Sequence, residues 1–528
     1  MKKIIAILLI MLVLLIGCSQ KEQTQGNSAG QPVVCNKPYI LVGTGCCLDQ
    51  NNNSICDKDE TAQQAPQTEP KQPPSGTPNS TSAPNATPAP APVPVPNSSI
   101  PNAAPTPNAT LTPAPSPNNS CVSQFTDTKQ MDIFDSHVHI SPKISASQMI
   151  SEMNKAGVSV ANLYGDRSNS LNAISQYPGR FVTFADTPDY PKPSAWLAEG
   201  PAFAASAEQQ LKTGRYDGVG EANLRYYSGR APIPPPDIYV PADNPLWLAL
   251  VDLSARYHVP ISFHFIPDDP VANAAFERML NHNKDATLIW AHLGFNDLPL
   301  NSTELNGYFL RYPNLYLDTA GLQNMQNPLP QPNSNWALLA NQSDKGRLNG
   351  EWRQFFETWN ARILFGSDAG GGGNGLERWL NYADNSVGGA TPDAVGHWKQ
   401  LFSNLDRNSA RNIMSGNARE LFLKEQKPPY EYLVSSDGRC YSVFVSSNSS
   451  VSGLAFDPDT RAITFTVAGS SGTAGSAAIT IPTALARGNF TASVDGRSVE
   501  SQSASNSTHV TIRVEYAGGI RTITLKEK

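Results

Sequence analysis

Four of the eight histidines in this 528-residue chain stand where short apolar runs end. His137 and His139 lie in MDIFDSHVHI (residues 131–140), His264 lies in ISFHF and His292 in IWAHLG. Side chains alternate along a strand, so the H-x-H pair faces one side and both imidazoles can reach one metal ion. Two histidines spaced by two occur by chance on any strand, and the later histidines are what give the pair its meaning.

Two carboxylates also stand at or just after the ends of short apolar runs. Glu221 ends the apolar run in GVGEANL, and Asp368 follows the run in ILFGSDAG. Histidine and carboxylate ligands suit zinc with one position left open for water. Zinc lowers the pKa of that water to about 7, and Asp368 is the candidate general base that accepts its proton. A core histidine satisfied by a backbone partner is the usual alternative for one residue, but packing does not explain a converging set.

The elements that must position these residues span Met131 to about Lys424, where short apolar runs alternate with amphipathic stretches. The eight strand-like runs are 133–138, 158–164, 180–186, 218–224, 260–265, 287–292, 315–319 and 362–366. The helix-like stretches include 147–156, 246–257, 271–282 and 350–360. Eight alternations in ~290 residues predict a (β/α)8 TIM barrel of the α/β class, with its chemistry at the carboxyl ends of the strands. A doubly wound open sheet is the alternative, although no glycine-rich dinucleotide loop follows the first strand.

In this region the sequence resembles the amidohydrolase superfamily, and in particular its amidohydrolase-2 branch of metal-dependent TIM-barrel hydrolases. The matching segments are FDSHVHI, ISFHF, WAHLGF, RILFGSDAG and, at residues 412–422, NIMSGNARELF. The resemblance covers the whole predicted barrel, which we place at residues 125–425.

The resemblance implies a role for each strand-end residue. His137, His139 and His264 are implied as metal ligands, and Asp368 as a ligand or the catalytic base. His292 is implied either to ligate a second metal or to act in catalysis by polarising the substrate.

Glu221 occupies the strand at which some relatives carry a carboxylate that bridges two metals, and in others that position binds nothing. The expected cofactor is therefore a divalent metal, one or two ions, with zinc the first choice.

The leading functional hypothesis is a metal-dependent hydrolase of a small ester, lactone, amide or phosphoester. The second is a metal-dependent carboxy-lyase, because the same branch contains decarboxylases with nearly the same ligands. The third is a non-catalytic envelope protein that uses the barrel for binding, although such a protein has no need of the intact ligand set. Residues 125–425 contain no cysteine and no G-x-S-x-G motif that would supply a competing nucleophile.

Residues near Glu221 are the candidates for binding a small-molecule substrate. Arg225 and Tyr227 could hold an anionic or aromatic group, and so could Trp247, but each could equally pack within the fold. The net charge of −6 and the absence of a basic stripe in the sequence argue against nucleic acid as a partner.

The first residues resemble an export signal. Two lysines precede an apolar run at residues 4–16, which is too short for a comfortable membrane span. LIGC at residues 15–18 resembles a lipobox, which implies removal of residues 1–17, lipidation of Cys18 and a tether at residues 18–34. An uncleaved N-terminal anchor is the alternative. The expected location is the extracellular face of the cell membrane, with the protein lipid-anchored or secreted.

Residues 35–60 contain four cysteines, for which an extracellular location favours disulfides over a zinc site. They are Cys35, Cys46, Cys47 and Cys56. The same module resembles an EF-hand calcium loop, with oxygen donors at positions 1, 3, 5, 9 and 12. Those donors are Asp49, Asn51, Asn53, Asp57 and Glu60. Ser54 stands where the family has glycine, and an acidic surface loop is the alternative to calcium binding.

Residues 61–124 are dominated by Pro, Ala, Thr, Ser and Asn. Such a segment buries too little apolar surface to offset the entropy lost on ordering, which predicts a disordered linker. Its Asn-x-Ser/Thr sequons predict a glycoprotein where the host has the machinery. They begin at Asn79, Asn85, Asn97, Asn108 and Asn118.

Residues 430–528 alternate apolar and polar residues with period two, which predicts a small β-sandwich domain. The predicted strands are 462–467, 477–481, 490–494, 509–514 and 521–525. The segment resembles a β domain that recurs in archaeal surface proteins, which implies spacing or attachment to the cell envelope.

Cys121 and Cys440 are predicted to form a disulfide. In a closed barrel the first strand neighbours the eighth, so the two ends of the domain lie close together. Cys121 stands just before the barrel and Cys440 just after it. Lipidation of Cys18 and pairing within residues 35–56 would account for the other five cysteines.

Overall fold

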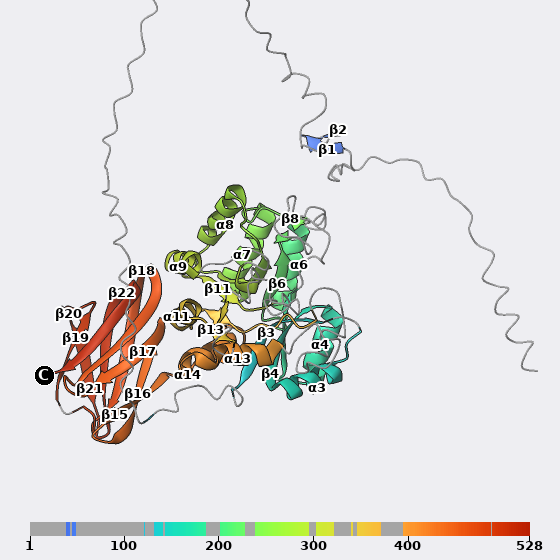
Figure 1. The fold of residues 1–528 in the computed structure, drawn as a ribbon. Helices are drawn as coiled ribbons and strands as arrows, with labels where there is room; N and C mark the ends of the chain where they lie inside the picture. The colour runs from blue at the N-terminus through green and yellow to red at the C-terminus, as the bar shows by residue number, and fades with distance from the viewer. Residues whose placement is uncertain are drawn as a thin grey trace, which may run out of the picture. The chain divides into compact units, whose positions relative to one another are not determined.

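The computed structural model describes residues 39–42, 45–48, 121, 131–140, 143–185, 201–226, 238–294, 302–320, 339–341, 346–370, 394–486 and 488–528. The chain divides into two compact units, Met1–Ala109 and Thr110–Lys528. In the first unit, β1 (Tyr39–Val42) and β2 (Gly45–Leu48) form an antiparallel hairpin (Figure 1). The predicted signal peptide, Cys18 and the calcium loop lie outside the described residues, as does the linker apart from Cys121.

No helix within the described ranges is both long enough and apolar enough to cross a membrane.

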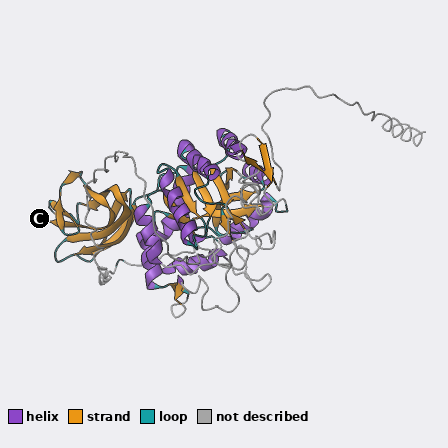
Figure 2. Cartoon of the chain, turned by 90° about the horizontal axis from the view of Figure 1, so that it is seen from above, coloured by secondary structure: helices purple, strands orange, loops and turns teal. Residues whose placement is uncertain are grey.

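Eight parallel strands form the barrel of the second unit (Figures 1 and 2). They are β3 (Ile133–Ile140), β4 (Val158–Gly165), β5 (Phe181–Ala185), β6 (Gly218–Asn223), β9 (Pro260–His264), β10 (Thr287–Trp290), β11 (Leu315–Asp318) and β14 (Ile363–Leu364). Their order in the sheet is their order in the chain. At the seam between β3 and the segment after β14, the Ser136 N–H donates to the Phe365 carbonyl at 2.8 Å and the His139 N–H to the Ala369 carbonyl at 2.8 Å. The predicted TIM barrel and its eight strands are confirmed.

Helices surround the barrel on its outer side (Figure 2). They are α3 (Ala146–Ala156), α4 (Arg167–Gln176), α6 (Pro201–Lys212), α7 (Pro245–Tyr257), α8 (Pro270–His282), α9 (Ser302–Arg311), α11 (Gly350–Thr358), α13 (Ala394–Leu401), α14 (Arg407–Arg411) and α15 (Asn417–Leu423). Asn244 and Asp269 cap α7 and α8 by accepting backbone N–H groups of the first turn. In both helices proline follows at the first helical position, where its missing N–H costs nothing.

Two short hairpins extend the connections after the strands. The first joins β7 (Arg225–Tyr226) to β8 (Ile238–Tyr239), directly after β6. The second joins β12 (Ala340–Asn341) to β13 (Arg347–Leu348), between β11 and β14.

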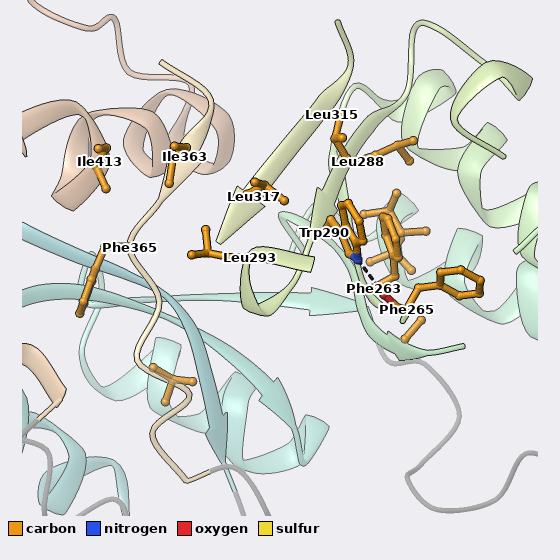
Figure 3. Close-up of a cluster of buried hydrophobic side chains, with 14 of the residues drawn as sticks. Phe263, Phe265, Leu288, Trp290, Leu293, Leu315, Leu317, Ile363, Phe365 and Ile413 are labelled. Atoms are coloured by element: carbon orange, nitrogen blue, oxygen red, sulfur yellow. Dashed lines mark hydrogen bonds between the residues drawn. The ribbon is translucent and has the colours of Figure 1, made fainter. Parts of the chain in front are cut away.

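Large apolar side chains pack between the strands and the surrounding helices (Figure 3). Trp290 of β10 lies among them, and its indole N–H donates to the Phe265 carbonyl at 2.8 Å. Trp247, which the sequence offered as a substrate contact, is fully buried on α7. Its indole N–H points to the Met279 sulfur at 2.8 Å, and its ring packs on Phe263. Trp247 therefore belongs to the core, because it lies on the apolar face of its helix.

The C-terminal residues form an antiparallel β domain. Its strands are β15 (Tyr430–Ser436), β16 (Arg439–Ser447), β17 (Ser450–Asp457), β18 (Ala462–Pro482), β19 (Phe490–Val494), β20 (Arg497–Val499), β21 (Ser501–Ser505) and β22 (His509–Glu527). They join in the order β15-β16-β18-β22-β19-β20, with β17 paired to β18 and β21 to β22.

Two of these strands are longer than the sequence predicted. The predicted strands 462–467 and 477–481 are halves of β18, and 509–514 and 521–525 are halves of β22. The register between β18 and β22 shifts between Gly469 and Ala474, which marks a β-bulge. Both halves of each strand bury side chains in one apolar cluster. The sheet therefore folds over one core, as a β-sandwich does, but through long bent strands where shorter, separate strands were predicted.

The β domain contacts the barrel at the start of β14. The buried Arg362 guanidinium donates to the Ser470 hydroxyl at 3.2 Å and to the Phe309 carbonyl at 2.7 Å. Cys121 and Cys440 lie at disulfide-bonding distance, with their Cα atoms 5.6 Å apart, so this pair joins the segment preceding the barrel to β16.

Candidate metal centre

The carboxyl ends of five barrel strands bring six side chains with metal-ligating atoms to one place. They are His137, His139, Glu221, His264, His292 and Asp368. His137 and His139 belong to β3, Glu221 to β6 and His264 to β9. His292 and Asp368 stand just beyond β10 and β14.

The ligating atoms lie about one ligand spacing apart. His137 Nε2 is 3.1 Å from His139 Nε2 and 3.2 Å from Glu221 Oε2. Asp368 Oδ1 is 3.3 Å from His139 Nε2. On the other side of the cluster, Glu221 Oε1 is 3.2 Å from His292 Nε2.

These spacings fit a bound divalent ion. Two ligand atoms that are each about 2.0–2.1 Å from a tetrahedral zinc ion lie roughly 3.3 Å from one another. Two groups of three side chains have ligand atoms that all lie within 4.8 Å of one another: His137, His139 and Asp368, and His137, Glu221 and His292. The donor set therefore suits one ion and contains the ligands for a second.

Asp318, which the sequence analysis missed, fixes the orientation of His137. Its Oδ2 lies 2.9 Å from His137 Nδ1, and its Oδ1 accepts the backbone N–H groups of His292 at 2.8 Å and Ala320 at 3.0 Å. Because Nδ1 faces a carboxylate, its proton stays there and Nε2 is left to bind a metal. The strand-end rule would have found Asp318, since it is the last residue of β11.

Burial and the nearby carboxylates act in opposite directions on the histidines of β3. Burial disfavours the charged form of His137, but Glu221 and Asp318 outweigh it and raise its pKa well above the usual value. Burial is likewise outweighed at His139, where Asp368 and Glu221 raise the pKa to about 8. Both histidines therefore attract positive charge, as metal ligands among carboxylates do.

The pKa values of His264 and Asp368 are shifted toward the states that bind metals, whereas at His292 burial is outweighed by Glu221, which raises the pKa. Burial and the neighbouring His292 lower the pKa of His264 to about 3, so its imidazole is neutral. Its Nε2 is buried without a hydrogen-bond partner within the described part of the chain, while its Nδ1 lies 3.7 Å from Glu221 Oε1. Burial opposes ionisation of Asp368, but His139 outweighs it and lowers the carboxyl pKa.

Three residues at the site have left-handed backbone. His292, Leu293 and Asp368 have φ values of 61°, 51° and 57°, in the left-handed region that residues other than glycine seldom adopt. Such conformations persist where the surrounding structure fixes them, and they are frequent at functional sites.

The cluster opens toward solvent on one side. The side chains of His139 and Asp368 are 29% and 13% exposed, whereas those of His137 and Glu221 are 0% and 5% exposed. The ring of Tyr164 packs edge-on against His137 with centroids 4.8 Å apart and is itself buried. A substrate would therefore approach from the side of His139 and Asp368.

Arg225 and Tyr227 are the two remaining residues that the sequence suggested for binding a substrate. Arg225 is buried, and its guanidinium contacts Asp268 and Asp269 at 2.6–2.8 Å, so its charge is already neutralised. This pairing argues against Arg225 as a residue that binds an anionic substrate. Tyr227 lies outside the described residues.

No family model matches the chain, and no curated protein matches it.

Several solved structures are similar to the chain. A probable 2-pyrone-4,6-dicarboxylic acid hydrolase from Acinetobacter baumannii, with citric acid bound, is 15% identical, covers 55% of this chain and 99% of its own, and has a TM-score of 0.33. Aminofutalosine deaminase from Helicobacter pylori is 12% identical over 54% of this chain and 73% of its own, with a TM-score of 0.28. A glycoside hydrolase family 30 subfamily 8 xylanase from Clostridium acetobutylicum is 11% identical over 75% of this chain and 99% of its own, with a TM-score of 0.30. Likeness at these scores carries no conclusion about function.

Proposed function

We propose that the barrel is a metal-dependent hydrolase of a small ester, lactone, amide or phosphoester. The observation that carries this proposal is the convergence of four histidines and two carboxylates, with neighbouring ligand atoms 3.1–3.7 Å apart. Burying so many ionisable groups together is costly unless they pair or coordinate a metal. A divalent ion gives this arrangement a physical purpose, and zinc suits its nitrogen and oxygen donors.

His137, His139 and Asp368 would hold one ion, and Glu221 and His292 provide donors for a second. A bound ion lowers the pKa of a water molecule and so makes a nucleophile available near neutral pH. The chain's own part is to hold the donors in place. The Glu221 side chain is only 5% exposed, and the surrounding structure fixes His292 and Asp368 in left-handed backbone conformations.

Asp368 is the group best placed to move the proton. In the metal-free protein its carboxylate is ionised at neutral pH, because His139 outweighs the effect of burial on its pKa. Its side chain also lies on the solvent-facing side of the cluster. From there it can accept a proton from the attacking water and return it to the leaving group. His292, with its ring nitrogen beside Glu221, is the candidate to polarise the substrate.

The test is a screen of the metal-loaded full-length chain against lactones, esters, amides, phosphoesters and carboxylated aromatic compounds. Asp368→Asn should lower turnover by roughly two to four powers of ten, the usual range for a general base. Asp252→Asn, which alters a surface carboxylate 3.0 Å from His282, is the matched control and should keep wild-type turnover.

The product separates hydrolysis from its alternative. Incorporation of solvent oxygen without release of carbon dioxide identifies a hydrolase, whereas carbon dioxide release identifies the carboxy-lyase. Wild-type turnover in Asp368→Asn would contradict the assigned role of that residue. A folded, metal-loaded protein inactive on every substrate would favour a binding role.

We further propose that the chain is exported and anchored to the membrane through a lipid on Cys18. Residues 35–60 would then form a calcium-binding module, and the β domain would contact the cell envelope. Fatty-acid labelling that persists in Cys18→Ala would contradict the lipid anchor. Calcium binding unchanged by Asp49→Ala would contradict the calcium loop.

A further inference from the structure

Arg225 is a buried charged side chain that follows the strand carrying Glu221. It is the first residue of β7, directly beyond β6, and its side chain is 5% exposed. Its Nε lies 2.8 Å from Asp268 Oδ1, and one terminal nitrogen lies 2.6 Å from that same oxygen and 2.8 Å from Asp269 Oδ2. The ring of Tyr239 covers the guanidinium, with its centroid 4.6 Å from the central carbon.

These ion pairs join the segments that follow two ligand-bearing strands. Arg225 comes four residues after Glu221, and Asp268 comes four residues after His264. Asp269 also caps α8, accepting the N–H groups of the first turn through its other oxygen. Arg225 therefore ties the end of β6 to the end of β9 and to the start of α8.

The ladder between β6 and β9 is irregular at Glu221. Val219 pairs with Ile261, and the next pair is Ala222 with Phe263, so β6 has one extra residue in this interval. Such a bulge turns a side chain toward a new direction and interrupts the pairing that would hold it there. The direction of the Glu221 carboxylate then depends on how firmly the strand is held on each side of the bulge.

Beyond the bulge, β6 pairs with β9 again at Ala222–Phe263 and Asn223–His264. The Leu224 N–H donates to the His264 carbonyl at 3.0 Å, and the next residue is Arg225. Its two ion pairs are buried on the arginine side, where they are screened by water far less than a surface pair. A charge-assisted contact made by a planar fork also restricts direction as well as distance.

We propose that Arg225 is a positioning residue for the metal centre: by binding Asp268 and Asp269 it holds the ends of β6 and β9 together and thereby fixes Glu221 relative to His264. This inference rests on the proposed function, since it assigns Arg225 a role toward the metal ligands. It replaces the role of Arg225 in binding an anionic substrate.

The test titrates Co²⁺ into the metal-free full-length chain and records both the metal bound and the visible absorption of bound cobalt. Arg225→Lys keeps the positive charge but loses the fork. We expect the cobalt affinity of this variant to fall about 10–100-fold, the usual effect of losing an outer partner of a ligand, and its absorption spectrum to change. Arg419→Lys is the matched control, because Arg419 also contacts two carboxylates: Asp132, just before β3, at 2.8 Å and Glu425, just after α15, at 3.3 Å. Its cobalt affinity should equal that of wild type.

A double variant separates positioning from a general effect on the fold. If Arg225 acts through Glu221, Arg225→Lys should add little to the loss of affinity caused by Glu221→Gln. Equal losses in both backgrounds, or wild-type affinity in Arg225→Lys, would overturn the inference. Asp268→Asn, which weakens the same contact from the other side, takes the place of Arg225→Lys if that variant does not fold. A wild-type chain that binds no cobalt instead contradicts the proposed function itself.

Discussion

Asp318 links three parts of the site through one buried carboxylate. One oxygen faces His137 Nδ1, and the other accepts the backbone N–H groups of His292 and Ala320. It thus holds the ring of one candidate ligand and the main chain of another. Without the charge of Asp318, the proton of His137 would no longer be held on Nδ1, and the positions of His137 and His292 would both be disturbed.

We predict that Asp318→Asn lowers zinc affinity about 10–100-fold, because an amide no longer requires the His137 proton to stay on Nδ1. Competition with a chromophoric chelator measures the affinity. Asp252→Asn is the control, because Asp252 also contacts a histidine, His282, at 3.0 Å but at the surface. Equal zinc affinity in the two variants would show that Asp318 does not orient a ligand.

Metal affinity should depend steeply on pH. The pKa of His139 is raised to about 8 and that of His137 is raised well above its usual value, so the metal-free protein holds protons on both rings at neutral pH. A metal must displace them, and affinity should rise about tenfold per pH unit for each displaced proton. The rise should be steeper below pH 8 than above it, where His139 is already neutral. Zinc titrations between pH 6 and 9 measure the slope, and a flat profile below pH 8 would contradict these roles.

At the residue scale, the sequence predicts which groups meet but not how they face one another. The strand-end positions of His137, Glu221 and Asp368 follow from short apolar runs and barrel geometry. The central place of Glu221, whose carboxylate lies within 3.5 Å of three histidines, could not be predicted. It depends on a bulge in β6, and a bulge leaves no mark in the hydrophobic pattern.

At the scale of elements, buried parallel strands were predicted to within two residues at each end. Each is a continuous apolar run bounded by polar residues, which is a strong local signal. The bent strands β18 and β22 were divided in two, because glycine and serine in their middle resemble turn residues. Those small residues instead let the folded halves of the sheet approach closely. A Cβ on Gly518 would overlap the Ser470 carbonyl oxygen.

Gly518→Ala should destabilise the β domain by roughly 1–3 kcal/mol or more, because the added methyl group meets backbone that cannot rotate away. Urea unfolding followed by circular dichroism measures the change. Gly307→Ala in α9 is the control, since a Cβ there meets nothing within 4 Å. That substitution should raise stability by up to about 1 kcal/mol. Wild-type stability in Gly518→Ala would show that this approach is not tight.

At the scale of the whole unit, buried polar groups join the barrel to the β domain. Asn360 lies between α11 and β14 and donates to the Val451 carbonyl at 3.0 Å. Its side-chain oxygen accepts the Tyr430 hydroxyl at 3.0 Å and the Asn412 amide at 2.9 Å. Buried hydrogen-bond networks of this kind favour one arrangement and are costly to break. A sequence pattern gives no sign of them, because each partner is distant in the chain.

Asn360→Ala should lower the free energy of unfolding by about 3 kcal/mol or more. The Tyr430 hydroxyl and the Asn412 amide would each be buried without this acceptor, and each loss costs about 1–3 kcal/mol. Denaturant unfolding of the full chain measures it. Asn281→Ala, which removes an exposed contact to the Glu277 carbonyl, is the control and should change little. A loss no larger than the control's would mean that the two domains are not held together through Asn360.

The central claim is that the strand-end side chains bind a divalent metal, and elemental analysis of the full-length chain purified from zinc-supplemented cells tests it most directly. The wild type should contain one or two equivalents of metal, and His137→Ala should contain less than a tenth of that, since His137 belongs to both ligand groups. If two ions are bound, Glu221→Ala should reduce the content from two equivalents to one. A correctly folded wild-type chain that retains no metal and takes up none on titration would contradict the account.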